Sequence, residues 1–203
     1  MTNDNRGPWS DTYTGRFYPL TPRPEDIHIR DIAQGLGNIC RFTGQCRTFF
    51  SVAQHSILVA LLCPVEDRLW GLLHDAAEAY IADVSRPVKY LAEMQPYRNR
   101  ERLIQSVIAR RFGLSMPIPP TVKKADNILL ATEARDLTRN GGRDWQLEEK
   151  PMDERIVPWS PDAAGQTFYE CMLSLLNGNT DLVPNVRSMN TFEVLEFRQT
   201  SVM

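Results

Sequence analysis

The sequence has few of the residues from which metal sites and covalent cross-links are most often built. Among its 203 residues are only three histidines, and its four cysteines include no Cys-x-x-Cys pair. The cysteines mostly stand among apolar residues with helical spacing, so we predict that they are reduced core residues: Cys40, Cys46, Cys63 and Cys171. His28 stands beside charged residues at the start of an expected helix, and we predict an ordinary surface or capping residue there.

The chain also lacks a long apolar run and a strong charge of either sign. No window approaches the length of a membrane span, and the first residues contain no apolar segment of signal-peptide length. The formal net charge of −2 argues against binding to duplex nucleic acid, which favours an excess of Lys and Arg. We therefore expect a cytoplasmic protein that has neither a membrane nor duplex nucleic acid as its partner.

Length and composition predict a single folded domain. A chain of 203 residues, of which 42% are hydrophobic and 24% charged, is typical of one globular unit with a sizeable core. We expect a flexible N-terminus over 1–12, the folded domain over 13–178 and a C-terminal tail over 179–203. Aromatic residues and prolines at 14–24 favour an irregular or hairpin arm, and the alternation in TFEVLEFR at 191–198 permits one short strand.

Two of the three histidines lie in the most informative stretch, residues 51–89. It contains two apolar segments with helical spacing, 52–62 and 69–81, which carry His55 and His74. Pro64 cannot continue a helix, so these segments are predicted to form an antiparallel helical hairpin. Each histidine follows apolar residues and should face the interior. Because a buried imidazole needs a partner, a shared metal ion is the most economical solution.

A second pair of buried polar residues is expected on a later helix, over 121–138. Asp126 and Glu133 are two helical turns apart, so both carboxylates lie on one face, among Ile128, Leu129 and Ala131. A carboxylate in such apolar surroundings favours a cation. We assign Asp126 as a metal ligand and Glu133 as a supporting group that does not bind the metal itself.

Other residues in these segments suit the handling of a phosphate ester. Glu78 stands four residues after His74 in the same expected helix, where it can orient or deprotonate a water molecule. Just before the His55 helix, the segment CRFTGQCRTFF at 40–50 combines arginine, which matches phosphate, with phenylalanine, which offers a face to a base. Its aromatic residues could instead fill the core, and Arg47 competes with Arg41 for the phosphate.

His55, the adjacent pair His74-Asp75 and the distant Asp126 resemble the pattern of the metal-dependent HD-domain phosphohydrolases. The flanking motifs are similar to the subgroup that contains bacterial 5'-deoxynucleotidases and phage deoxyadenosine triphosphate triphosphohydrolases. These motifs are CRFTG at 40–44, SVAQH at 51–55, HDAAE at 74–78 and ADVSRPVK at 82–89. The resemblance spans about 13–175 and implies an all-α, HD-domain helical bundle.

The resemblance also implies a role for each matching residue. One divalent metal ion would be held by His55, His74, Asp75 and Asp126, because HD families with two metals need further histidines. The mixed nitrogen and oxygen set suits Co, Mn, Zn, Fe or Ni, and Mg can arrive with the substrate. The implied catalytic acids are Glu78 and Asp83, and the implied substrate-binding residues are Arg41, Phe42 and Lys89.

The activity implied is hydrolysis of a 2'-deoxynucleoside 5'-phosphate at the phosphorus attached to the 5' oxygen. A triphosphate substrate, which would release triphosphate, is slightly favoured over a monophosphate, which would release phosphate. Two alternatives stay open: a nucleotide-binding HD protein without turnover, and a hydrolase of a signalling nucleotide. The resembling enzymes are dimers or larger rings, so we expect a homo-oligomer, with the charged segment 140–160 as a candidate contact, a lid or a mobile loop.

Overall fold

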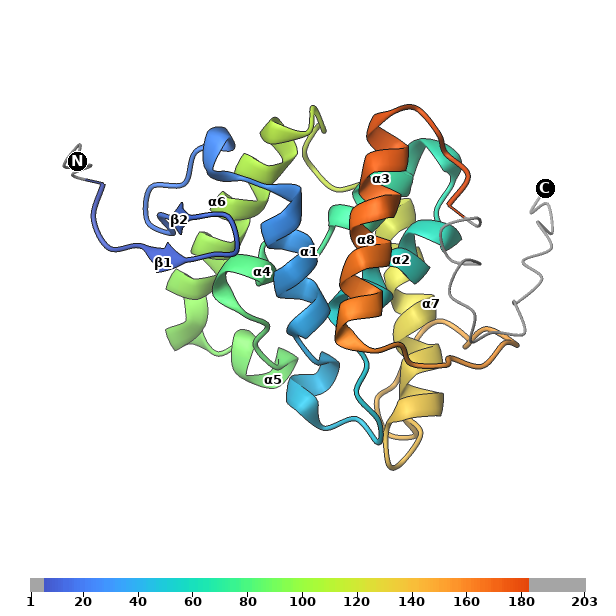
Figure 1. Cartoon of the computed structure of the whole chain (residues 1–203). Helices are drawn as coiled ribbons and strands as arrows, with labels where there is room; N and C mark the ends of the chain where they lie inside the picture. Colours follow the sequence, from blue (N-terminus) through green and yellow to red (C-terminus); the bar gives the residue numbers. More distant parts are fainter. Residues whose placement is uncertain (1–5, 183–203) are drawn as a thin grey trace.

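The computed structural model describes residues 6–182, which form a mostly helical structure with one short hairpin (Figure 1). The all-α class predicted from the sequence is therefore confirmed. The short strand predicted at 191–198 lies outside the described residues. Within them, no helix combines the length and the apolar composition that crossing a membrane requires.

The elements follow one another with short connections, except for the long segment 138–160 that precedes the last helix. The hairpin consists of β1 (Ser10–Asp11) and β2 (Arg16–Phe17), and a 3₁₀ turn, η1 (Pro24–Asp26), leads into α1 (Ile29–Asn38). Next come η2 (Arg41–Gly44), α2 (Val52–Leu62), η3 (Val65–Asp67) and α3 (Arg68–Leu73). Three short elements follow, α4 (Glu78–Ile81), α5 (Arg86–Lys89) and η4 (Ala92–Met94). The remaining helices are long: α6 (Gln95–Arg111), α7 (Pro120–Leu137) and α8 (Pro161–Leu176).

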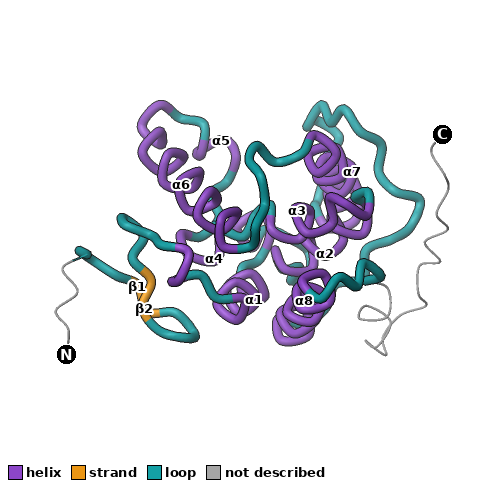
Figure 2. The backbone as a smooth tube through the Cα atoms, turned by 90° about the horizontal axis from the view of Figure 1, so that it is seen from above, coloured by secondary structure: helices purple, strands orange, loops and turns teal. Residues whose placement is uncertain are grey.

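Helix α2 runs through the interior, in contact with α1, α3, α7 and α8 (Figure 2). Every residue from Val52 to Ala60 is buried, so the polar side chains of this helix must find partners inside the protein. Gln54 finds them in the segment before α8, where its amide donates to the Val157 carbonyl at 2.8 Å and accepts from the Trp159 N–H at 2.8 Å. His55, one residue later, meets polar side chains from other helices.

A glycine allows α3 to approach α2 closely. A Cβ atom at Gly71 would lie 2.8 Å from the Cα atom of Ala60 and 2.9 Å from the Cys63 sulfur, so no larger residue fits without movement of the helices. The same holds where α8 crosses α1, because a Cβ atom at Gly165 would lie 3.0 Å from the Ala33 carbonyl oxygen. The first of these crossings brings the end of α3 beside the His55 helix.

The helix predicted over 69–81 is divided into α3 and α4 by a tighter turn, so the prediction of one continuous helix is wrong. In this turn the Ala76 N–H donates to the Leu73 carbonyl and the Glu78 N–H donates to the Asp75 carbonyl, both at 3.0 Å. These i to i+3 bonds are those of a 3₁₀ turn. Glu78 therefore does not stand one regular α-helical turn beyond His74.

Side chains replace the backbone bonds that this break removes. The His74 Nδ1 atom lies 2.7 Å from the Gly71 carbonyl oxygen, and the Gln105 amide donates to the Leu73 carbonyl at 2.7 Å. The Gln105 Oε1 atom also accepts from the Ala77 N–H at 3.2 Å. The break is thus stabilised by Gln105 from α6, which the local pattern of 69–81 does not contain.

The N-terminal segment, expected to be flexible over 1–12, contacts the rest of the chain where it is described. From residue 6 onward its placement is described, and the Arg6 guanidinium donates to Asp26 at 3.0 Å and to the Thr21 carbonyl at 2.8 Å. The expected arm at 14–24 takes its hairpin form, because β1 pairs with β2 and the Thr14 N–H donates to the buried Asp31 at 2.8 Å.

The four cysteines, predicted to be reduced core residues, form no disulfide among the described residues. Cys63 and Cys171 are buried in the core, whereas Cys40 and Cys46 are half-buried on either side of η2.

Candidate metal centre

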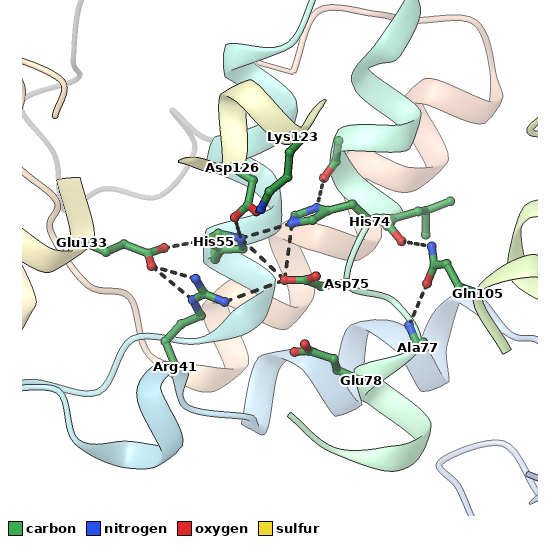
Figure 3. A network of polar contacts seen from close by, with 12 residues as sticks. Arg41, His55, His74, Asp75, Ala77, Glu78, Gln105, Lys123, Asp126 and Glu133 are labelled. Carbon is green, nitrogen blue, oxygen red and sulfur yellow. Dashed lines mark hydrogen bonds and ion pairs between the residues drawn. The ribbon is translucent and has the colours of Figure 1, made fainter. Parts of the chain in front are cut away.

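Four polar side chains from three parts of the chain meet beside α2 (Figure 3). His55 Nε2 lies 3.2 Å from His74 Nε2. The Asp75 Oδ2 atom lies 3.6 Å from the first of these nitrogens and 3.3 Å from the second. Asp126, from α7, places Oδ1 3.4 Å from His55 Nε2. The structure thus brings together the four expected metal ligands, and we call His55, His74, Asp75 and Asp126 the polar centre.

Both imidazoles are oriented by a contact to the nitrogen that faces away from the polar centre. His55 Nδ1 lies 2.5 Å from Glu133 Oε1, and His74 Nδ1 lies 2.7 Å from the Gly71 carbonyl oxygen. Since both partners are acceptors, each Nδ1 carries the proton, and each Nε2 is directed to the shared point. Histidines that bind metals have this arrangement.

The charges of the polar centre require a cation. Burial, and the positive charge of Arg41, lower the pKa of His55, but Glu133 and Asp126 outweigh them and raise that pKa to about 9. Burial likewise raises the pKa of Asp75, but its contact with His74 outweighs burial and holds the pKa well below the usual range. Without a metal, a proton on His55 therefore supplies the positive charge that the carboxylates demand.

The donor set fits a divalent transition metal. Its two imidazole nitrogens and two carboxylates are the mixed ligands that such ions accept. Three residues offer ligand atoms that all lie within 4.8 Å of one another: His55, His74 and Asp75. Asp126 lies against His55, and its second oxygen is 2.6 Å from the Lys123 ammonium nitrogen.

Glu133 and Arg41 support the polar centre from one side. Glu133 is fully buried, and its Oε2 atom accepts from Arg41 Nε at 3.2 Å and from Arg41 Nη2 at 2.9 Å. The third guanidinium nitrogen, Nη1, lies 3.7 Å from Asp75 Oδ2. Glu133 thus holds both His55 and Arg41, which is the position expected for a supporting group. Arg41, expected to bind substrate, lies at the edge of the polar centre.

Arg47 makes its contacts elsewhere. Its N–H donates to the Leu137 carbonyl at 2.8 Å, and its guanidinium donates to the Arg139 carbonyl at 2.9 Å. These carbonyls lie at the end of α7, where an arginine satisfies groups that the helix leaves free. The structure therefore does not bring Arg47, the competing phosphate-binding candidate, to the polar centre.

Glu78 is a buried carboxylate whose charge is stabilised by few hydrogen bonds or cations. Its side chain is buried, and Oε2 has no hydrogen-bond partner within residues 6–182. Burial raises the pKa of Glu78 well above its usual range, and the charges of Asp75 and Asp83 raise it further. The nearest cation, the Lys89 ammonium, is 4.0 Å from Oε1. A buried carboxylate with a raised pKa beside other charged groups is a candidate for proton transfer.

The expected residues Asp83 and Lys89 lie on the segment that follows α4. Ala82, at the end of α4, has φ 65° and ψ 164°, a conformation that residues other than glycine rarely adopt. Its carbonyl accepts a hydrogen bond from the Tyr97 hydroxyl at 2.6 Å, and Lys89 Nζ lies 2.5 Å from Glu101 Oε1. Sequence reasoning missed Tyr97 and Glu101, which hold this segment from α6.

A groove of about 280 Å³ lies elsewhere, between α1 and α8. It shares no residue with the polar centre, and its lining is mostly polar, including Arg30, Gln34, Asn38 and Gln166. The groove therefore plays no part in the chemistry of the polar centre.

Comparison with known proteins shows the family. No family model matches the sequence. The chain is 36% identical over 127 residues to the uncharacterized protein RCAP_rcc00048 of Rhodobacter capsulatus, which covers 58% of this chain and 64% of that protein. It is 42% identical over 163 residues to the uncharacterized protein YfdR of Escherichia coli (strain K12), over 78% of this chain and 90% of YfdR. At this identity and coverage, the chain belongs to the same protein family as YfdR.

Proposed function

We propose that this protein is an HD-domain phosphohydrolase that cleaves 2'-deoxynucleoside 5'-phosphates. The observation that carries the proposal is the Glu78 carboxylate, which is buried beside the polar centre with one oxygen unpartnered within residues 6–182. A purely structural ion-pair network gains nothing from such a group, because an unsatisfied buried carboxylate is costly. Hydrolysis, in contrast, needs a group that accepts a proton from water.

The polar centre would hold one divalent transition metal, of the class of Co, Mn, Zn, Fe or Ni, through His55, His74, Asp75 and Asp126. When bound, such an ion polarises a phosphoryl oxygen and lowers the pKa of water towards neutrality. Glu133 fixes the His55 ring by accepting a hydrogen bond from its Nδ1 atom at 2.5 Å, so that Nε2 stays directed to the centre.

Glu78 would orient a water molecule and accept its proton. Its raised pKa makes it a stronger base than an ordinary carboxylate, which suits this task. Burial raises that pKa most, Asp75 and then Asp83 raise it further, and Arg41 and Lys89 limit the rise.

Arg41 and Lys89 would bind the phosphate. The Nη1 atom of Arg41 lies next to Asp75, and the other two guanidinium nitrogens, Nε and Nη2, donate to Glu133, so the guanidinium is held rigidly. The Lys123 ammonium, at the Asp126 carboxylate, adds a further cation at the rim, and Mg can accompany the substrate. These cations favour a triphosphate slightly over a monophosphate.

A panel of nucleotides tests the proposal. Protein loaded with Mn or Co is incubated with deoxy- and ribonucleotides, both mono- and triphosphates, and with signalling nucleotides, and the released phosphate and triphosphate are separated by chromatography. We expect release from the 2'-deoxynucleotides. Equal rates on ribonucleotides would contradict the deoxy preference alone. Silence across the panel with metal bound would instead support a nucleotide-binding protein.

We also propose a homo-oligomer, with segment 140–160 as a contact. The end of this segment is attached to α7, since the Ile156 N–H donates to Asp136 at 2.9 Å. Glu148 and Lys150, which come after Trp145, are exposed and would contact a second copy. Light scattering that shows a monomer at working concentration would contradict this proposal.

A further inference from the structure

Two aromatic side chains from distant segments meet near the polar centre. Phe42 belongs to η2, and Trp145 belongs to the turn that follows α7. Their ring centroids are 5.6 Å apart, with the ring planes inclined by 51°. Trp145 is 40% exposed and Phe42 is half-buried, so the pair lies at the surface rather than in the apolar core.

The backbone on both sides of this pair is in unusual conformations. Phe42 and Thr43 have φ of 53° and 52°, and Gln146, next to the tryptophan, has φ 49°. Residues other than glycine rarely adopt such angles, and proteins keep them where a side chain must be presented in a particular direction. Gly141 and Gly142, with φ of 66° and 69°, begin the turn that carries Trp145.

Hydrogen bonds hold the two segments against each other. The Arg47 backbone and side chain donate to the Leu137 and Arg139 carbonyls, which attaches the loop after η2 to the end of α7. In the turn itself, the Trp145 N–H donates to the Gly142 carbonyl at 3.1 Å. These bonds hold the loop after η2 and the turn after α7 next to each other.

Arg41 connects the aromatic pair to the polar centre. Its guanidinium carbon lies 5.5 Å from the Phe42 ring centroid, and the same guanidinium reaches to 3.7 Å from Asp75. A ligand whose phosphate lies at Arg41 and the polar centre can thus place its remaining part beside Phe42 and Trp145. In a nucleotide, that part is a planar base.

We propose that Phe42 and Trp145 form the site for the nucleobase, with Trp145 as its exposed stacking face. This inference rests on the proposed function, because it assumes a nucleotide at the polar centre. Aromatic faces stack on every base, so the site would bind purines and pyrimidines without reading their edges. Loss of one such face weakens binding by about tenfold to hundredfold.

Tryptophan fluorescence tests the inference without turnover. The chain contains four tryptophans, of which Trp9 is 46% exposed and serves as the matched control. Metal-loaded E78Q protein is titrated with dATP and with dTMP, and we expect both to quench the emission. W145F should lose the quench and keep its affinity by calorimetry within a few fold, W145A should bind about tenfold to hundredfold more weakly, and W9F should behave as the parent.

Kinetics and binding together separate this inference from the proposed function. In otherwise wild-type protein, W145A should raise KM with little change in kcat. If the wild-type protein hydrolyses nothing but its quench depends on Trp145, the base site stands and the hydrolase proposal fails. If hydrolysis occurs and W145A leaves both KM and dATP affinity unchanged, the base site is wrong. Absence of any nucleotide binding would overturn it as well.

Discussion

The two sides of the polar centre are built differently. On the side of α2 and α7, Glu133 is fully buried and accepts hydrogen bonds from both His55 and Arg41. On the side of α4 and α5, Glu78 is buried without a comparable partner, and its nearest cation, Lys89, is bound to Glu101 instead. The first side holds charges in fixed places. The second leaves one carboxylate able to change its protonation, which is what proton transfer requires.

Replacement of Glu78 should have the largest effect on activity and almost none on stability. We expect E78Q to lower kcat by about 10²- to 10⁴-fold, the usual contribution of a general base. The free energy of unfolding should change by less than about 1 kcal/mol, because glutamine removes a poorly compensated buried charge. Steady-state kinetics and urea unfolding measure the two effects, with the exposed Glu93 as the control in E93Q. Full activity in E78Q would remove Glu78 from the mechanism.

Replacement of Glu133 should lower the free energy of unfolding, which the replacement of Glu78 leaves almost unchanged. E133A leaves the buried Arg41 and the Nδ1 proton of His55 without their acceptor, and breaking a buried ion pair in this way costs about 3–5 kcal/mol. Urea unfolding with a chelator present in every sample excludes a contribution from metal loss. A loss below about 1 kcal/mol, similar to that of E78Q, would show that the two sides do not differ.

Asp136 is a further carboxylate of α7 that hydrogen bonds hold in place, and it should make the free energy of unfolding depend on pH. Burial raises the pKa of Asp136, but hydrogen bonds from Arg135, the Ile156 N–H and Arg155 outweigh it and hold that pKa below its usual value. A lowered pKa in the folded state means that the stabilisation is complete above about pH 5 and is lost as the pH falls through the folded pKa.

D136N should therefore lower the free energy of unfolding by about 1–2 kcal/mol at pH 7, and this difference should shrink below about pH 4. Urea unfolding of both proteins at a series of pH values measures it. A difference that stays constant with pH would contradict an ionised Asp136 as the cause.

The strained end of α4 should give the smallest effect. Ala82 has φ 65° and ψ 164°, which costs about 1–3 kcal/mol for a residue with a side chain. A82G removes that strain at an entropic cost of about 0.5–1 kcal/mol, so we expect a net stabilisation of about 1 kcal/mol. Ala79, inside α4, is the matched control, because A79G should destabilise. Equal destabilisation by both variants would show that Ala82 is not strained.

The bounds of several helices could be predicted because their signals are local. Helix α2 has the predicted limits, since it begins after Ser51, whose hydroxyl accepts one of the N–H groups left free in the first turn, that of Gln54. Helix α8 begins in the same way, with the Ser160 hydroxyl accepting from the Ala163 N–H. Helix α6 begins at Gln95, and Pro96 fits the first turn of a helix. The break between α3 and α4 depends on Gln105, more than two dozen residues later, and no local pattern contains it.

Much of the candidate site could be predicted for the same reason. Asp126 and Glu133 share a helix face by simple periodicity, and both contact His55. The choice between Arg41 and Arg47 could not be made, because it depends on the left-handed turn at Phe42 and Thr43. Trp145 gave no signal, since its meeting with Phe42 is set by how α7 ends, not by the residues around it.

Metal content tests the central claim most directly. The purified protein is loaded with Mn or Co, dialysed and analysed for bound metal by mass spectrometry, together with H74A, D126A and the control H28A, whose residue lies outside the polar centre at the start of α1. We predict about one ion per chain in the wild type and in H28A, and a strong loss in H74A and D126A. Wild-type protein that binds no metal, or H74A that binds as much as the wild type, would contradict the account.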